Sequence, residues 1–277
     1  MTLTMNIWPQ DPWGRVLNGA VSIAQLPVNV VDMAETAADI AHQRFEDDLH
    51  SIYLSGEISR NQGREPEFIV ILRQKTKTIG LDLFAAAAGL RLQRFHSEFG
   101  TCKFSVYSWE ELFPEDGRFS WPRFKLAVNS ISIAGRDLKG LIAPQRLSVA
   151  ASNASIVGLS DKLSGFMRRL KAVASESRVH STSRQFAKTC LGAAFSLVMA
   201  DEQVYSEDPE TMASFAGLTF IDHRQSLAAL ARLSRTGTLS SLEAQAVCAD
   251  AMTWLPLAAE TWLDQHNPER DEALRLV

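Results

Sequence analysis

The sequence predicts a small α/β domain with a mixed sheet, followed by an all-α domain. Two short apolar segments in the N-terminal half, Ile52–Leu54 and Phe68–Leu72, have the length and composition of buried strands. A third segment, Cys102–Tyr107, alternates apolar and polar residues, which indicates a strand with one buried face. After the small, polar and proline-bearing stretch 143–158, apolar residues recur at helical spacing. We place the domain boundary in that stretch.

These patterns predict three parts: an irregular N-terminal segment at 1–28, a mixed-sheet domain at 29–145 and a helical domain at 155–277. Within the second part, residues 29–48 have the apolar spacing of an amphipathic helix, and 78–92 are rich in the helix-favouring residue alanine.

Periodicity leaves one segment of the sheet domain undecided, because Phe124–Asn129 fits a helix as well as a strand. In the helical domain, Ser160 has the residue type of an N-cap, and Ser240 with Glu243 fits a capping box at the start of a later helix. We expect Pro256 to kink or end that helix.

Composition and charge argue against several classes of protein. The chain has 277 residues, a formal net charge of −4 and 3 cysteines far apart in sequence. The charge balance gives no general attraction to nucleic acid or anionic membranes. Three cysteines so far apart indicate buried free thiols in a reducing compartment. No charge-free apolar run reaches the roughly 18 residues of a membrane span, and we expect a cytoplasmic protein.

The stretch from Ser51 to Leu72 carries the strongest chemical signal. A loop of small and polar residues between the two predicted strands can bring backbone N–H groups to a phosphate. Glu65 and Glu67 precede the second strand, and residues two apart at a strand entrance point the same way. Two carboxylates aimed at one point can hold Mg²⁺, which favours carboxylate and phosphate oxygens. The alternative is a hairpin with two solvated glutamates.

This stretch resembles the signature of the DNA polymerase beta-type nucleotidyltransferase superfamily, and most of all bacterial proteins akin to aminoglycoside adenylyltransferases. Their pattern is a strand, Arg-Gly-Ser-Val-Ala-Arg-Gly, a loop and Ser-Asp-x-Asp. Here Tyr53, Leu54, Gly56 and Arg60 match that pattern. A second likeness is the segment SISIAGRDL, at 130–138, to the family's Ser-x-x-Ile-x-Gly-x-Asp-Leu.

The resemblance implies a set of site residues. Glu65 and Glu67 stand where the two metal-binding, catalytic aspartates would be. The residues implied in nucleotide binding are Gly56, Glu57, Ser59, Arg60, Lys103, Lys188 and Tyr205.

The sequence departs from the family pattern at several of these positions. Glu57 replaces the phosphate-binding serine, Asn61 replaces the second glycine, and the loop is a few residues short. Lys103 lies on the strand that normally carries a third carboxylate, on the same face as Ser105 and Tyr107. We therefore expect Lys103 to form an ion pair with one of the two glutamates when no ligand is bound.

Two functions follow from the resemblance. The first is Mg²⁺-dependent transfer of a nucleoside monophosphate from a nucleoside triphosphate, with ATP as substrate, to a hydroxyl of a small molecule or a protein. The second is a catalytically degenerate relative, a pseudoenzyme that binds nucleotide or a partner protein. Scattered histidines and the absence of a nucleophile-elbow motif argue against a Ser-His-Asp hydrolase.

Overall fold

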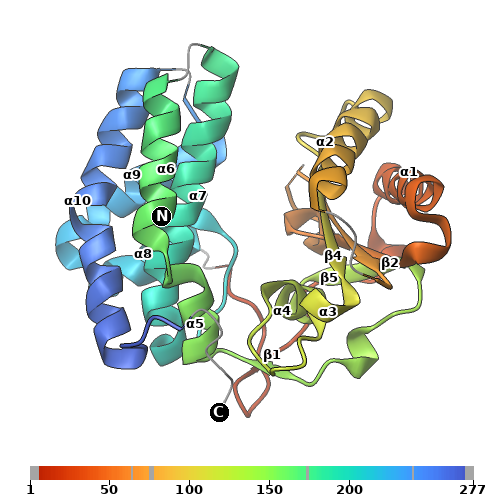
Figure 1. Ribbon diagram of the computed structural model, residues 1–277, viewed down its shortest axis with the longest axis horizontal. Coiled ribbons are helices and arrows are strands. Elements are labelled where there is room, and N and C mark those ends of the chain that lie inside the picture. The colour runs from red at the N-terminus through yellow and green to blue at the C-terminus, as the bar shows by residue number, and fades with distance from the viewer. Residues whose placement is uncertain (1–5, 64, 75–77, 173–174, 239, 272–277) are drawn as a thin grey trace. The chain divides into compact units, whose positions relative to one another are not determined.

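The computed structural model describes residues 6–63, 65–74, 78–172, 175–238 and 240–271, so the ends of the predicted first and last parts lie outside the described residues. The chain divides into two compact units. One unit is Trp8–Arg146, and the other is Met1–Ile7 with Leu147–Val277. The first contains a mixed sheet and the second consists of helices, which confirms the predicted fold class (Figure 1).

The described residues of the α/β unit form a four-stranded sheet in the order β4-β3-β2-β5. The bounds of its strands are β2 Leu49–Ser55, β3 Glu67–Leu72, β4 Lys103–Ser108 and β5 Ser130–Gly135. Strand β2 is antiparallel to both β3 and β5, whereas β3 and β4 are parallel. The predicted strands Ile52–Leu54 and Phe68–Leu72 are therefore adjacent in one mixed sheet, as we expected.

Helices cover both faces of this sheet (Figure 1). Helices α1, Val28–Phe45, and α2, Thr78–Phe95, pack on the face that carries Ile52 and Phe68. The opposite face, which carries Tyr53 and Ile69, packs against residues of the short helix α3, Trp109–Leu112, and of α4, Trp121–Val128. Because side chains alternate along a strand, each continuous apolar strand contributes side chains to the hydrophobic core on both faces of the sheet.

The segment Phe124–Asn129, whose periodicity fits a helix as well as a strand, is helical up to Val128, the last residue of α4. Ser120 is its N-cap and accepts a hydrogen bond from the Arg123 backbone N–H at 3.3 Å, and Pro122 occupies its first turn. Both are helix-start signals. The segment 1–28 is also less irregular than predicted, because β1, Arg15–Val16, pairs with β6, Gln145–Arg146. Short 3-10 helices complete this unit: Ile23–Gln25, Glu46–Asp48, Glu57–Arg60 and Lys139–Leu141.

The helical unit is arranged around α7, Glu176–Glu202, whose buried face includes Phe186, Cys190 and Leu197. The helices packed around it are α5 Val149–Ile156, α6 Leu159–Ala172, α8 Pro209–Thr219, α9 Arg224–Thr236 and α10 Ser241–His266. A 3-10 helix, Ile221–His223, joins α8 to α9.

One expectation for the helical unit needs correction, and one helix was not predicted. Ser160 is not an N-cap, because α6 already begins at Leu159. Helix α8 went unpredicted, although Asp208 caps it and Pro209 follows directly, both helix-start signals. Of the two outcomes expected at Pro256, an end of the helix does not occur, because α10 continues to His266 with Pro256 inside it. Ser240 does cap α10, accepting a hydrogen bond from the Glu243 backbone N–H at 3.2 Å.

The cysteines are free and buried, as the sequence suggested. Burial raises the pKa of Cys102 to about 11 and that of Cys248 to about 12. The pKa of Cys190 is also raised, first by burial and then by the neighbouring Cys248. Within the part of the chain that the structure describes, no helix is both long enough and apolar enough to cross a membrane.

Gly135 is the tightest backbone contact of the sheet and generates a first prediction. Its φ is +80°, and a Cβ built on it would lie 2.2 Å from the carbonyl oxygen of His50. We expect Gly135→Ala to lower the free energy of unfolding by about 2 kcal/mol or more, through strain and overpacking. Chemical denaturation measures this. The control Gly140→Ala, where a Cβ meets nothing within 4 Å, should change stability by less than about 0.5 kcal/mol.

Candidate functional site

Glu67 lies directly beside Lys103 in the sheet. It is the first residue of β3, and the parallel register pairs it with Lys103, the first residue of β4. Directly paired residues share a face, so their side chains meet. The Lys103 Nζ donates to Glu67 Oε1 at 2.9 Å, and the Ser105 hydroxyl donates to the same oxygen at 3.1 Å. The expected ion pair between Lys103 and a glutamate is confirmed.

A second lysine, which the sequence analysis missed, reaches Glu67 from the helix above. Lys125 on α4 donates from its Nζ to Glu67 Oε2 at 2.6 Å. The contact exists because Glu67 and Ile69 share the face on which α4 packs, through Leu126. No local sequence pattern identifies Lys125, since its contact with Glu67 depends on how α4 lies across the sheet.

Glu67 is thus a largely enclosed carboxylate between two ammonium groups. Its side chain is only 14% exposed, against 29% for Lys125 and 64% for Lys103. Burial alone raises the pKa of Glu67, but the charges and hydrogen bonds of Lys125 and then Lys103 outweigh it and hold the pKa well below its ordinary value. Glu67 is therefore ionised at neutral pH, and the three side chains together carry a net charge of +1.

This arrangement does not fit a magnesium ion on Glu67. Both of its oxygens already accept hydrogen bonds from ammonium groups, and a cation approaching the three side chains meets net positive charge. Across the described residues, no group of three or more His, Cys, Asp or Glu side chains could hold a metal ion.

The predicted phosphate loop lies next to the acidic pair. Gly56 has a φ of +85°, and a Cβ built on it would lie 3.7 Å from the Glu65 carbonyl oxygen and 4.0 Å from Glu67 Cβ. Glu65 is half-buried in the coil before β3. Glu57 begins the 3-10 helix Glu57–Arg60 that follows Gly56, and its carboxylate lies against Gly63.

Two other loop residues point their functional groups elsewhere. Ser59 is fully buried, and its hydroxyl is held by the Gly56 carbonyl at 2.8 Å and by Asn129 Oδ1 at 2.7 Å. The Arg60 guanidinium stacks over the ring of Trp8, 4.0 Å from its centroid. Both residues therefore have interactions that hold the loop against the rest of the α/β unit.

Lys188 and Tyr205 belong to the helical unit. Lys188 is exposed on α7. Tyr205 is buried, and its hydroxyl donates to Glu207 Oε1 at 2.8 Å. Their place at the nucleotide site stays a prediction.

The lowered pKa of Glu67 generates a prediction on stability. Because the folded pKa lies below the unfolded one, the pairing stabilises the fold above the unfolded value and is lost as pH falls through the folded pKa. We expect Glu67→Gln to lower the free energy of unfolding by about 2 kcal/mol at pH 7. That difference from the natural protein should shrink below about pH 5. Urea denaturation across pH measures it.

Glu35→Gln is the matched control, because Glu35 is exposed on α1 and the substitution removes the same charge. It should change stability by less than about 0.5 kcal/mol. A Glu67→Gln effect that did not vary between pH 7 and pH 3 would contradict the electrostatic account.

Comparisons with known proteins support the fold. No protein-family model matches the chain, and no curated protein matches its sequence. A solved structure, that of a spectinomycin adenyltransferase from Enterococcus faecialis with ATP and spectinomycin, resembles this chain with a TM-score of 0.52 and 11% sequence identity. The match covers 83% of this chain and 98% of that one. The chain thus has the fold of an adenyltransferase, with an α/β unit followed by helices.

Proposed function

We propose that this protein is a catalytically degenerate, nucleotidyltransferase-like protein that binds a nucleoside triphosphate, ATP, without a metal ion on Glu67. The observation that carries the proposal is the bridge from Lys103 through Glu67 to Lys125. In this proposal the two ammonium groups supply the positive charge that Mg²⁺ supplies to triphosphates in nucleotidyl transfer.

Charge and geometry support phosphate binding at this bridge. Lys103, Glu67 and Lys125 together carry a net charge of +1, which favours an anionic ligand such as a triphosphate at these three side chains. Each ammonium has three N–H donors, and the Lys103 side chain is largely exposed, so it can reach a phosphate while Glu67 keeps Lys125. Gly56 lies beside Glu67, where the backbone N–H groups of its loop contribute further donors.

The fold comparison favours a nucleotide as the ligand. The similar adenyltransferase was solved with ATP, and the match extends over nearly the whole of that chain.

Metal-dependent transfer of a nucleoside monophosphate to a hydroxyl is the second candidate. The similar adenyltransferase favours it, because that protein was solved with a small molecule, spectinomycin, as well as with ATP. In this candidate, Glu65 and Glu67 act as the metal-binding and catalytic carboxylates, and the acceptor is a small molecule or a protein side chain. It requires both lysines to leave Glu67 before a metal ion binds there.

The two candidates predict opposite effects of Glu67→Gln on ATP affinity. In the degenerate protein the substitution removes a negative charge beside the phosphates, and ATP should bind about threefold or more tightly, with or without Mg²⁺. If Glu67 holds a metal ion, the substitution should instead abolish the tightening of ATP binding by Mg²⁺. Isothermal titration calorimetry with and without Mg²⁺ separates them, with Glu35→Gln as the charge-matched control.

Lys103→Asp tests whether the positive charge of Lys103 both excludes Mg²⁺ and binds ATP. The substitution changes the net charge of the group with Glu67 and Lys125 from +1 to −1. We expect it to create measurable Mg²⁺ binding and to weaken metal-free ATP binding by about tenfold. The control Lys103→Gln removes the lysine charge without adding a carboxylate, so it should weaken ATP binding without creating Mg²⁺ binding. Efficient transfer by the natural protein, abolished in Lys103→Asp, would show an active enzyme with Lys103 as phosphate ligand.

A further inference from the structure

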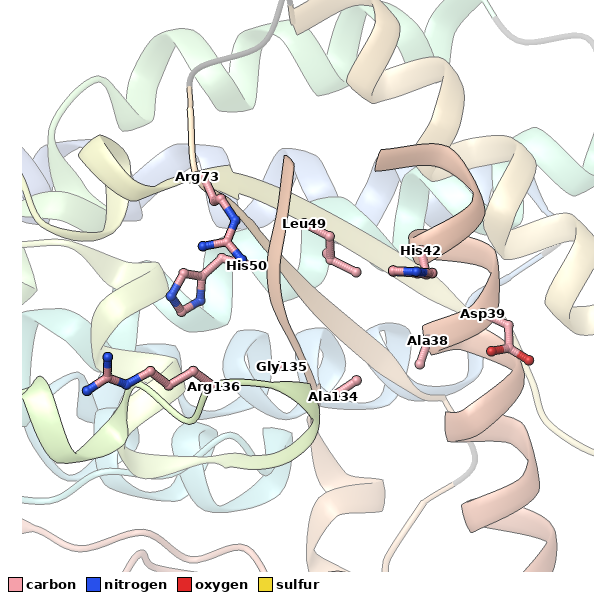
Figure 2. A pocket seen from close by; sticks show the side chains of 9 residues that line it. All are labelled: Ala38, Asp39, His42, Leu49, His50, Arg73, Ala134, Gly135 and Arg136. Atoms are coloured by element: carbon pink, nitrogen blue, oxygen red, sulfur yellow. The ribbon is translucent and has the colours of Figure 1, made fainter. Parts of the chain in front are cut away.

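A cavity lies at the other end of the sheet from Glu67. Its volume is about 570 Å³, and it lies between α1 and the strand ends at Leu49, Arg73 and Gly135 (Figure 2). Glu67 begins β3, whereas Arg73 follows the last residue of β3, so the length of that strand separates the two places. A cavity of this size falls in the range of small-molecule sites, roughly 300–1,000 Å³.

Strand directions bring three basic side chains to this cavity. His50 lies near the start of β2, while Arg73 follows β3 and Arg136 follows β5. Because β2 is antiparallel to both neighbours, these three positions meet at one edge. The missing side chain of Gly135 lets β5 approach the backbone of His50 closely. Figure 2 shows the three basic side chains gathered on one side of the cavity.

Among the residues that the structure describes, the arginines in this cavity lack acidic partners. In the described residues, neither Arg73 nor Arg136 forms a salt bridge with an acidic side chain. The Arg73 Nε donates to the Asp47 carbonyl oxygen at 2.9 Å, which fixes the base of the guanidinium. The acidic residue that lines the cavity, Asp39, is on α1 and lies apart from the basic group in Figure 2.

The positive charges of the two arginines act on the imidazole of His50. Its pKa is lowered, first by burial and then by the charges of Arg73 and Arg136. Its Nδ1 is within hydrogen-bond distance of the Ser51 hydroxyl, at 3.0 Å, and its ring lies 5.5 Å from that of Trp109. The imidazole thus lies beside two guanidinium groups that have no acidic partner in the described part of the chain.

We propose that His50, Arg73 and Arg136 form an anion site that binds the phosphate group of a small phosphate monoester. Two guanidinium groups provide planar, paired donors that match phosphate oxygens, and the imidazole adds a third donor. The remaining volume, toward His42 and α1, takes the organic part of the ligand. This site is separate from the phosphate site proposed at Lys103 and Lys125, and it does not depend on it.

Inorganic phosphate is the probe for a first test. Titrated into the full chain at about 150 mM NaCl, it should cause saturable changes in the amide NMR signals of His50, Arg73 and Arg136. Signals of Lys103 and Lys125 report on the other site in the same spectra, so the two proposals succeed or fail separately. No saturable change at the three residues would overturn the anion site.

Substitutions then test which side chains bind. Arg136→Gln and Arg73→Gln should each weaken phosphate binding about tenfold or more, because each removes a charge-assisted contact. The Arg136 side chain is exposed and has no hydrogen-bond partner among the described residues, so Arg136→Gln should leave the fold intact. Arg73→Gln removes the hydrogen bond to the Asp47 carbonyl, and Arg136→Gln therefore keeps the test valid if loss of that bond disturbs the fold. The control is Arg91→Gln, an exposed arginine on α2. Equal weakening in all three variants would mean general attraction only and would contradict the proposal.

Discussion

The parallel pairing of β3 with β4 determines the chemistry of the α/β unit. It places the first residue of each strand side by side on one face of the sheet. The carboxylate of Glu67 therefore lies beside the ammonium of Lys103 at the edge where both strands begin. Helix α4 covers that same face and adds a second lysine to the carboxylate. The enclosed Glu67 carboxylate therefore connects two strands and a helix, and removing it leaves two ammonium groups with uncompensated charge.

The same sheet carries two different environments at its two ends. At one end a carboxylate is enclosed by ammonium groups, and at the other end arginines line a cavity without acidic partners among the described residues. The parallel pairing of β3 with β4, together with helix α4, produces the first environment. The antiparallel pairing of β2 with both neighbours produces the second, because it brings the start of β2 to the edge where β3 and β5 end. The fold shared with an adenyltransferase thus fixes where side chains converge, while the residue types decide what can bind there.

Much of the fold could be predicted from the sequence, because apolar runs and alternation are local signals. The strand Phe68–Leu72 is apolar at every position, and its partner in the sheet, Ile52–Leu54, is also a short apolar segment. The ion pair of Glu67 with Lys103 was also predictable, since alternation puts Lys103 on the face opposite Phe104.

What could not be predicted depends on contacts between elements distant in sequence. Lys125 reaches Glu67 only because α4 lies across the sheet, and its own segment fits a helix or a strand. Ser59 looks like an exposed loop hydroxyl in the sequence, yet Asn129, seventy positions away, holds it in the interior. The basic cavity gives no local signal either, since His50, Arg73 and Arg136 are brought together by three strand ends.

The buried thiols have a consequence for how this protein responds to oxidants. A thiol reacts mainly as its thiolate, and pKa values of about 11 and 12 leave almost none of that form at neutral pH. Cys190 and Cys248 lie within the helical unit and Cys102 borders the sheet core, so each is also shielded from reagents. Alkylation therefore requires a unit to open, and the rate of modification at each cysteine measures how often the surrounding unit unfolds.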